Sequence, residues 1–179
     1  MNIIAVNDFF LDITGWSWDE VIGANWIEKF IPVELRDEMK RVLEEIIQSG
    51  GEAYPHYENP IMTRKGEIRL ISWNNIVLRD MDGSVTGTSS IGEDITEQVK
   101  AEEALRDSEK KFRSIFDNAT DGILLADMEN KKFYMANKTL CDMLGYTPEE
   151  ITKLDVMDIH PKDDLPYVIE QFEKQSKGE

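Results

Sequence analysis

Few side chains in this sequence could carry covalent or metal chemistry. The chain has one cysteine, Cys141, and two histidines, His56 and His160. The histidines lie in different halves of the chain without a second ligand nearby, so their spacing gives no zinc motif. Cys141 falls at an apolar position of a predicted helix, where a buried and unreactive thiol is expected. Because the sequence also lacks a Ser/His/Asp set and a phosphate-binding glycine loop, we expect no enzymatic activity.

One glycine pair needs separate consideration. Segment 49–53, Ser-Gly-Gly-Glu-Ala, has a faint likeness to the glycine-rich signature of diguanylate cyclases. It lacks the second acidic residue and the phenylalanine of that signature. It also follows a predicted helix, and glycines commonly form the C-terminal caps of helices. A structural role is therefore favoured over a catalytic one.

Composition and charge limit the class of protein. Of 179 residues, 41% are apolar and 31% are charged, which is typical of a globular protein. The net charge of −16 argues against binding to nucleic acid or to anionic membrane surfaces. No apolar run approaches the ~20 residues that span a bilayer, so we expect no membrane contact from this segment. The single cysteine and the lack of a visible signal peptide favour a cytoplasmic location, although an anchor could lie outside this chain.

The apolar pattern predicts helices followed by strands. A short strand is expected over 2–6, and a helix over 8–14 that ends at Gly15. A longer amphipathic helix follows Pro32, with apolar residues at helical spacing: Leu35, Met39, Val42, Leu43, Ile46 and Ile47. Glycine-containing turns then separate three predicted antiparallel strands, 53–63, 67–79 and 84–92.

A helix and a second strand pair are expected next. From 97 to 118 the chain is rich in Ala, Glu, Lys, Leu and Arg and has no Gly or Pro. A 4-3-4-3 spacing in this helix indicates either a short coiled-coil seam or a solvated linker helix. The seam positions are Ala101, Leu105, Ser108, Phe112 and Ile115. Segments 122–127 and 132–136 then predict a hairpin.

Segments 5–23 and 135–153 are two versions of one pattern. In each, an asparagine is followed by an aspartate, a glycine, an aromatic residue and a glutamate at the same spacing. An internal repeat indicates that one structural unit is used twice. Within this sequence, only the first copy is followed by the long strand region.

These motifs resemble the PAS family of sensory domains with its C-terminal strand motif, called PAC. The helical motif is matched by Asn7, Phe10, Gly15, Trp16, Asp19, Glu20 and Val21. The strand motif is matched at 57–60, Trp73, 79–83 and 92–97. The resemblance implies an α+β fold with an antiparallel five-stranded sheet in the order B-A-I-H-G, short helices on one face and a linking helix.

Both copies are incomplete against the family pattern. The resemblance implies a first unit over 1–96 without strand A, a linker helix over 97–111, and a second unit over 112–179 without strands G, H and I. A missing central strand would leave unpaired backbone groups, at about 1–3 kcal/mol each when buried. Strand 123–127 could fill the gap beside 88–95, within one chain or, as we favour, in a swapped dimer. The alternative is that the sequence is a piece of a longer tandem array.

The resemblance also bears on cofactors and on the ligand pocket. Flavin-binding members carry a reactive cysteine where this chain has Trp26 and a glutamine where it has Gly92, so no flavin is expected. Haem-binding members carry the axial histidine on helix F, where this chain has none, so no haem is expected. The candidate pocket residues are Trp26, Phe30, Met39 and Trp73, with plain core packing as the alternative for the tryptophans.

Asp94, Ile95 and Thr96 join the last strand to the linker helix. Asp94 or Thr96 can accept hydrogen bonds from the first turn of that helix, and in resembling proteins the helix carries the signal to the next module. We therefore expect a regulatory sensor or relay module of a prokaryotic signal-transduction protein.

The expected output is a two-component sensor histidine kinase or a cyclic-dinucleotide enzyme, whose catalytic part is not in this chain. The expected partners are that output domain and a second copy, bound through the sheet and the linker helix. Two alternatives stay open: a dimerisation or spacer module without a ligand, and a flavin or redox sensor that uses Trp26 and Trp73.

Overall fold

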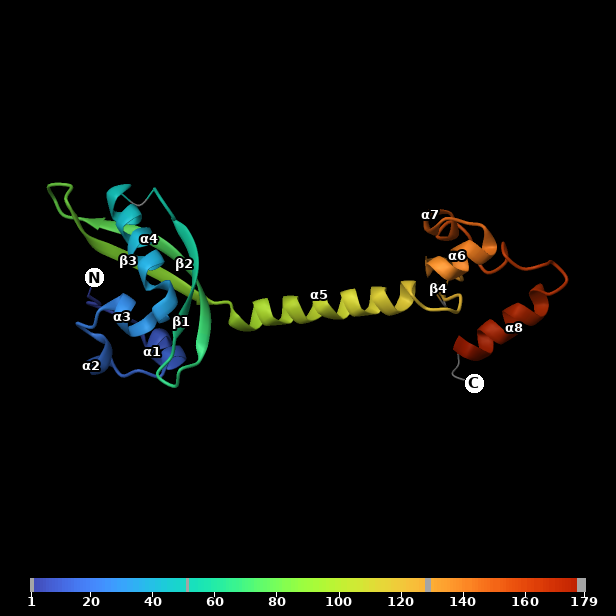
Figure 1. Ribbon diagram of the computed structural model, residues 1–179, viewed down its shortest axis with the longest axis horizontal. Helices are drawn as coiled ribbons and strands as arrows, with labels where there is room; N and C mark the ends of the chain where they lie inside the picture. The colour runs from blue at the N-terminus through green and yellow to red at the C-terminus, as the bar shows by residue number, and fades with distance from the viewer. Residues whose placement is uncertain (1, 51, 128–129, 177–179) are drawn as a thin grey trace. The chain divides into compact units, whose positions relative to one another are not determined.

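The computed structural model describes residues 2–50, 52–127 and 130–176. The chain divides into two compact units, Met1–Glu103 and Ala104–Glu179 (Figure 1). One helix, α5 (Thr96–Asp117), has residues in both units. Each unit has its own hydrophobic core.

The first unit begins with short helices and continues into a longer one. They are α1 (Asp8–Thr14), α2 (Trp18–Val21), α3 (Trp26–Phe30), the 3-10 turn η1 (Val33–Leu35) and α4 (Arg36–Gln48). The Asn7 side chain accepts a hydrogen bond from the Phe10 N–H at 3.0 Å and so begins α1. Gly15 ends that helix at φ 71°, a left-handed conformation that glycine adopts without strain. On α4 the predicted apolar stripe is buried at Met39, Val42 and Ile46.

Three antiparallel strands follow in the order β1-β2-β3. Their bounds are β1 (His56–Met62), β2 (Ile68–Arg79) and β3 (Val85–Asp94), in agreement with the three predicted strands. The register places Tyr57 opposite Trp73, and Trp73 opposite Gly92. Side chains alternate between the two faces of a strand, so Ile71 and Trp73 share the face that the helices cover (Figure 1). Fully buried Val21, Phe30 and Ile61 complete the core on that side.

The strand expected over 2–6 is not formed. Instead, Asn2 makes one isolated bridge with Asn25, and the backbone of Ile3 bonds to Gly23 and Ala24. Ile4 is 80% exposed. A strand needs a neighbouring strand for its backbone groups, and the segment finds a loop rather than a strand as its partner.

Helix α5 is exposed along most of its length. Only its two ends provide buried side chains: Thr96 is 7% exposed and Phe116 is 5% exposed. The helix is therefore held at its ends rather than along a face.

The second unit repeats the first part of the pattern. It contains β4 (Leu124–Ala126), β5 (Phe133–Ala136), α6 (Lys138–Leu144), α7 (Pro148–Ile151) and α8 (Leu165–Ser176). Strands β4 and β5 form the predicted hairpin. Its core contains Phe133, Ala136, Cys141, Ile151 and Val156. The expectation that Cys141 is buried is confirmed.

Asn137, the repeat of Asn7, does more than cap its helix. Its Oδ1 accepts from the Leu140 N–H at 3.0 Å and from the Ile123 N–H at 2.8 Å, just before β4. Its Nδ2 donates to the Asp121 carbonyl at 2.9 Å. Asn137 is fully buried, whereas Asn7 is exposed, because the first unit has no strand beside its asparagine.

The α+β arrangement with helices on one face of an antiparallel sheet is confirmed. The five-stranded order B-A-I-H-G is not assembled in the part of the chain that the structure describes, since β1-β2-β3 and β4-β5 form separate sheets. Both versions of the strand repair, with 123–127 beside 88–95 within one chain or in a swapped dimer, remain predictions.

Candidate signalling site

The junction between β3 and α5 ties the helix to the sheet. The Ile95 N–H donates to the Leu70 carbonyl at 3.0 Å, which extends the β2–β3 ladder beyond Asp94. The Thr96 hydroxyl oxygen then accepts from the Leu70 N–H at 2.8 Å. The Thr96 side chain, at the first position of α5, thus accepts the hydrogen bond that a backbone carbonyl would accept if β3 continued.

Asp94 holds the start of the same helix. Its Oδ1 accepts from the Thr96 N–H at 3.0 Å and from the Thr96 hydroxyl, and its Oδ2 accepts from Arg69 Nη1 at 3.2 Å. Burial opposes ionisation, but the Thr96 and Arg69 hydrogen bonds outweigh it and lower the pKa of the Asp94 carboxyl. Of the two side chains expected to cap α5, Asp94 does so, while Thr96 bonds to the sheet.

The four pocket candidates lie in one core, where three of them form an aromatic cluster. The rings of Trp26 and Phe30 are stacked with centroids 5.1 Å apart, and Trp26 meets Trp73 edge to face at 5.3 Å. Met39 belongs to the same buried core. The Trp73 indole N–H is buried without a hydrogen-bond partner among the described residues. These contacts fill the region with side chains, as the core-packing alternative expects.

Gly92 is the residue that lets Trp73 lie against β3. A Cβ at this position would come within 2.5 Å of Trp73 Cζ3 and 2.7 Å of Ile71 Cγ2. Contacts that short do not occur between real atoms, so the Trp73 ring occupies the space a side chain at 92 would need. Position 92 is also the one at which flavin-binding members carry their glutamine.

The predicted seam of α5 is exposed. Leu105 is 63% exposed, Phe112 45% and Ile115 72%, and Ala101 and Ser108 are also exposed. Phe116, which the spacing did not single out, is buried beside a cavity that β5 also lines, and it stacks on Phe112 at 5.3 Å. Its position one turn after Phe112 was the available signal.

The remaining candidate residues form no metal site. No group of three or more His, Cys, Asp or Glu side chains suited to a metal lies within residues 2–50, 52–127 and 130–176. Burial raises the pKa of the Cys141 thiol, so its thiolate is disfavoured. Gly50 adopts φ 69° after α4, in keeping with a structural role, and Gly51 lies outside the described residues.

One constellation was missed from the sequence. On the outer face of the sheet, His56 Nε2 lies 3.1 Å from Ser72 Oγ and His56 Nδ1 lies 3.0 Å from Asn74 Oδ1. The order resembles a Ser–His–acid set, but the third group is an amide and Ser72 is only 7% exposed. Cross-strand pairing explains these contacts, since 56 faces 74 in the register.

Two cavities lie in the second unit. One is enclosed in part by β4, β5 and α8, and the other lies between the end of α5 and β5. Neither is lined by Trp26, Phe30, Met39 or Trp73. No helix in the part of the chain that the structure describes is long and apolar enough to cross a bilayer.

Comparison with protein families gives two matches in tandem. A PAS fold model matches residues 3–91, and a PAS domain model matches residues 110–176. The chain belongs to the PAS family. PAS domains are sensory, non-catalytic modules, and the matches leave residues 92–109 between them, the end of β3 and the first part of α5.

Two sequence relatives are much longer proteins than this chain. The methyl sulfide methyltransferase-associated sensor of Methanosarcina acetivorans is 35% identical over 78 residues, which are 44% of this chain and 8% of that protein. The cell-division control histidine kinase PdhS of Brucella anthropi is 25% identical over 148 residues, 81% of this chain and 14% of that protein. The chain therefore spans a small part of either relative.

Solved structures with PAS-type folds are also similar. A sensory box histidine kinase/response regulator from Burkholderia thailandensis has a TM-score of 0.45 at 21% identity, covering 60% of this chain and 79% of that one. A light-oxygen-voltage domain studied with a flavin analogue has a TM-score of 0.45 at 19% identity, covering 62% of this chain and 78% of that one.

Proposed function

We propose that this chain is a regulatory relay module of a prokaryotic signal-transduction protein. The first PAS unit, 1–96, changes the state of its sheet, and the linker helix passes that state to the second unit and to an output domain. The output is a sensor histidine kinase or a cyclic-dinucleotide enzyme in the cytoplasm. Its catalytic part is not in this chain, which is not itself an enzyme.

The observation that carries this proposal is the hydrogen bond from the Leu70 N–H to the Thr96 hydroxyl. A shift of β2 relative to β3 must change or break this bond, because hydrogen bonds weaken steeply with distance and angle. The first turn of α5 then loses its fixed attachment. The junction converts a small movement in the sheet into a change in the helix, a population shift between two arrangements.

Thr96→Ala tests the relay. Leaving the half-buried Leu70 N–H without its partner costs about 1–3 kcal/mol, which is enough to bias a balanced switch. Hydrogen exchange should become faster in 97–105 and stay unchanged in 71–79. Thr86→Ala is the matched control, because Thr86 lies on β3, the strand that leads to Thr96, and its hydroxyl donates at 3.3 Å to the Leu78 carbonyl. An equal rise in both segments would show that Thr96 only stabilises the fold.

The ligand of the first unit belongs to the same proposal. Because Trp26, Phe30, Met39 and Trp73 are packed against one another, a ligand would have to displace part of this cluster, and the unpaired Trp73 indole N–H would then supply a donor for an acceptor on the ligand. A flavin fits poorly, because Trp73 fills the space beside Gly92. A haem has no axial histidine near this cluster, since His56 bonds to Ser72 and Asn74 on the outer face.

A homodimer is the second candidate role, and the exposed seam favours it. Leu105, Phe112 and Ile115 present apolar side chains at coiled-coil spacing with little cover within the chain. Pairing two α5 helices would bury them. Strand β3 lies at the edge of its sheet, so a swapped dimer that adds β4 of the partner would also pair an open edge.

A further inference from the structure

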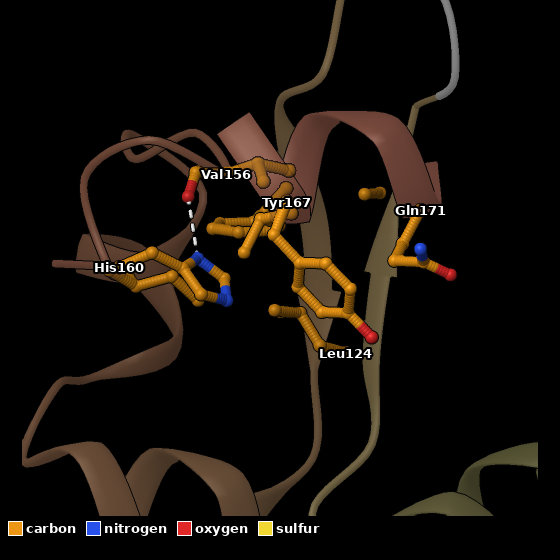
Figure 2. A pocket seen from close by; sticks show the side chains of 9 residues that line it. Leu124, Val156, His160, Tyr167 and Gln171 are labelled. Atoms are coloured by element: carbon orange, nitrogen blue, oxygen red, sulfur yellow. Dashed lines mark hydrogen bonds between the residues drawn. The ribbon is translucent and has the colours of Figure 1, made fainter. Parts of the chain in front are cut away.

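The two cavities of the second unit have different linings. The larger, about 290 Å³, lies against α8 and has mostly apolar walls, with the His160 ring on one side (Figure 2). The smaller, about 220 Å³, lies between the end of α5, strand β5 and helix α7. Among the residues that the structure describes, an arginine and an aspartate line the smaller cavity, and neither type lines the larger. The smaller cavity is therefore suited to a charged ligand.

Arg113 and Asp117 give this smaller cavity two opposite charges. They are four residues apart on α5, a spacing that places both side chains on one face of the helix with Cβ atoms about 5–6 Å apart. With the cation nearer the N-terminus, the order is the weaker one for a mutual ion pair. Within the part of the chain that the structure describes, neither side chain forms an ion pair or a hydrogen bond. Both charges are therefore available to a ligand.

The other walls of the cavity provide apolar contact. Phe116 is buried, and Met135 and Pro148 line the cavity with it. All three of residues 134–136 line it as well. Because side chains alternate between the two faces of a strand, the backbone of β5 must also border the cavity. A ligand that carries both charges and an apolar group can thus satisfy every wall.

Size narrows the choice of ligand. Because an apolar cavity of about 150 Å³ holds benzene with its six non-hydrogen atoms, about 220 Å³ holds roughly nine such atoms. A free α-amino acid carries an ammonium and a carboxylate on one carbon, so it can meet both charges of the cavity at once. Leucine, isoleucine and methionine have this form, this size and an apolar side chain. A residue inside a peptide has the side chain but neither charge.

We propose that this cavity binds a free apolar α-amino acid, with its carboxylate on Arg113, its ammonium on Asp117 and its side chain on Phe116 and Met135. Such a ligand would join the last turns of α5 to β5. The site is separate from the aromatic cluster of the first unit and from the cavity in Figure 2. It does not depend on the hydrogen bonds at Thr96, so the relay and this site can fail independently.

The test is a titration of the full chain with leucine, leucinamide and N-acetylleucine, followed by amide NMR. Leucinamide lacks the carboxylate and N-acetylleucine lacks the ammonium, and both keep the apolar side chain. Because the two protein charges are exposed, each ion pair contributes little, and each analogue should bind about two- to fivefold more weakly than leucine. Shifts should concentrate in 113–117, 134–136 and 148–152, and not in 159–171.

Two variants assign the charges. Arg113→Gln should remove the preference for leucine over leucinamide and keep the preference over N-acetylleucine, and Asp117→Asn should do the reverse. The matched controls are Arg106→Gln and Asp107→Asn, which change the same residue types on α5 outside the cavity and should keep both preferences. All four side chains are exposed, so none of these changes removes a buried contact.

Several results would overturn the proposal. Equal affinity for the three probes would show that the two charges take no part in binding, and the absence of binding would remove the site. Shifts confined to 159–171 would place leucine in the larger cavity instead. Loss of the preferences in a control variant would mean that the net charge of α5, rather than this cavity, sets the affinity.

Discussion

Replacing Asn137 and Asn7 by alanine should have unequal effects on stability, although the two residues occupy one motif. Both asparagines cap a helix, and the loss of such a cap costs about 1 kcal/mol. Among the residues that the structure describes, only the Phe10 N–H donates to the Asn7 side-chain oxygen. Asn137 also accepts from Ile123 and donates to Asp121.

The difference can be estimated bond by bond. Without Asn137, the half-buried Ile123 N–H has no partner, a loss of about 1–3 kcal/mol. The Asp121 carbonyl belongs to an exposed residue, so water can replace its partner. Asn137→Ala should therefore lower the free energy of unfolding of the second unit by about 2–4 kcal/mol. Asn7→Ala should lower that of the first unit by about 1 kcal/mol.

The distribution of tryptophan makes the two units separable by spectroscopy. The four tryptophans, at 16, 18, 26 and 73, are all in the first unit. Urea unfolding followed by tryptophan fluorescence therefore reports the first unit alone. Amide NMR signals of Phe133, Ile151 and Val156 report the core of the second unit.

The prediction is a crossed pattern. Asn7→Ala should shift the fluorescence transition and leave the NMR transition unchanged, and Asn137→Ala should do the opposite with the larger loss. Hydrogen exchange at Ile123 should also accelerate in Asn137→Ala. Equal losses for the two variants would refute the idea that contact with strand β4, rather than helix capping, distinguishes the two copies.

Three further outcomes are expected. Gly92→Ala should lower the free energy of unfolding of the first unit by about 1–3 kcal/mol through overpacking against Trp73, which tryptophan fluorescence can measure. Gly87→Ala on the same strand should not lower it, because nothing lies within 4 Å of the added Cβ. Folding lowers the pKa of Asp94, so the stability that its carboxylate contributes is complete above the unfolded pKa of about 4 and is lost as the pH falls through the folded pKa. Amide hydrogen exchange at 97–105 should therefore accelerate in that acid range. Asp94→Asn should remove this pH dependence. Leu105→Glu should shift sedimentation toward monomer while Arg106→Glu, one residue off the seam, does not; a wild-type protein that is already monomeric would contradict the dimer.

Where local signals decide the structure, the sequence was sufficient. The turns at 64–66 and 80–83 place β1, β2 and β3, and the Asn and Gly of each repeat bound α1 and α6. The expected strand 2–6 failed because a strand is defined by its neighbour, and the neighbour of this segment is a loop. No property of residues 2–6 alone distinguishes these outcomes.

The candidate sites show the same division. Asp94 and Thr96 were found because a capping motif is local, but the bond from Leu70 to Thr96 joins residues far apart in the sequence. His160 has no neighbouring ligand in the sequence. Its contact with the Val156 carbonyl and its place in a cavity with walls on β4 and α8 appear only in the structure. Such features depend on tertiary packing, which periodicity does not report.

The two ends of α5 are held by different kinds of interaction, and this difference bears on where a switch can operate. At Thr96 the attachment is a set of hydrogen bonds to Leu70 and Asp94, which fail over small changes in distance and angle. At Phe116 the attachment is apolar burial, which is non-directional and tolerates small displacements. A shift of the sheet can therefore release the first end of the helix without detaching the second. In the proposed relay, the junction at 94–96 would be the responsive element, and the Phe116 contact would be the fixed attachment through which a change in α5 reaches the second PAS unit.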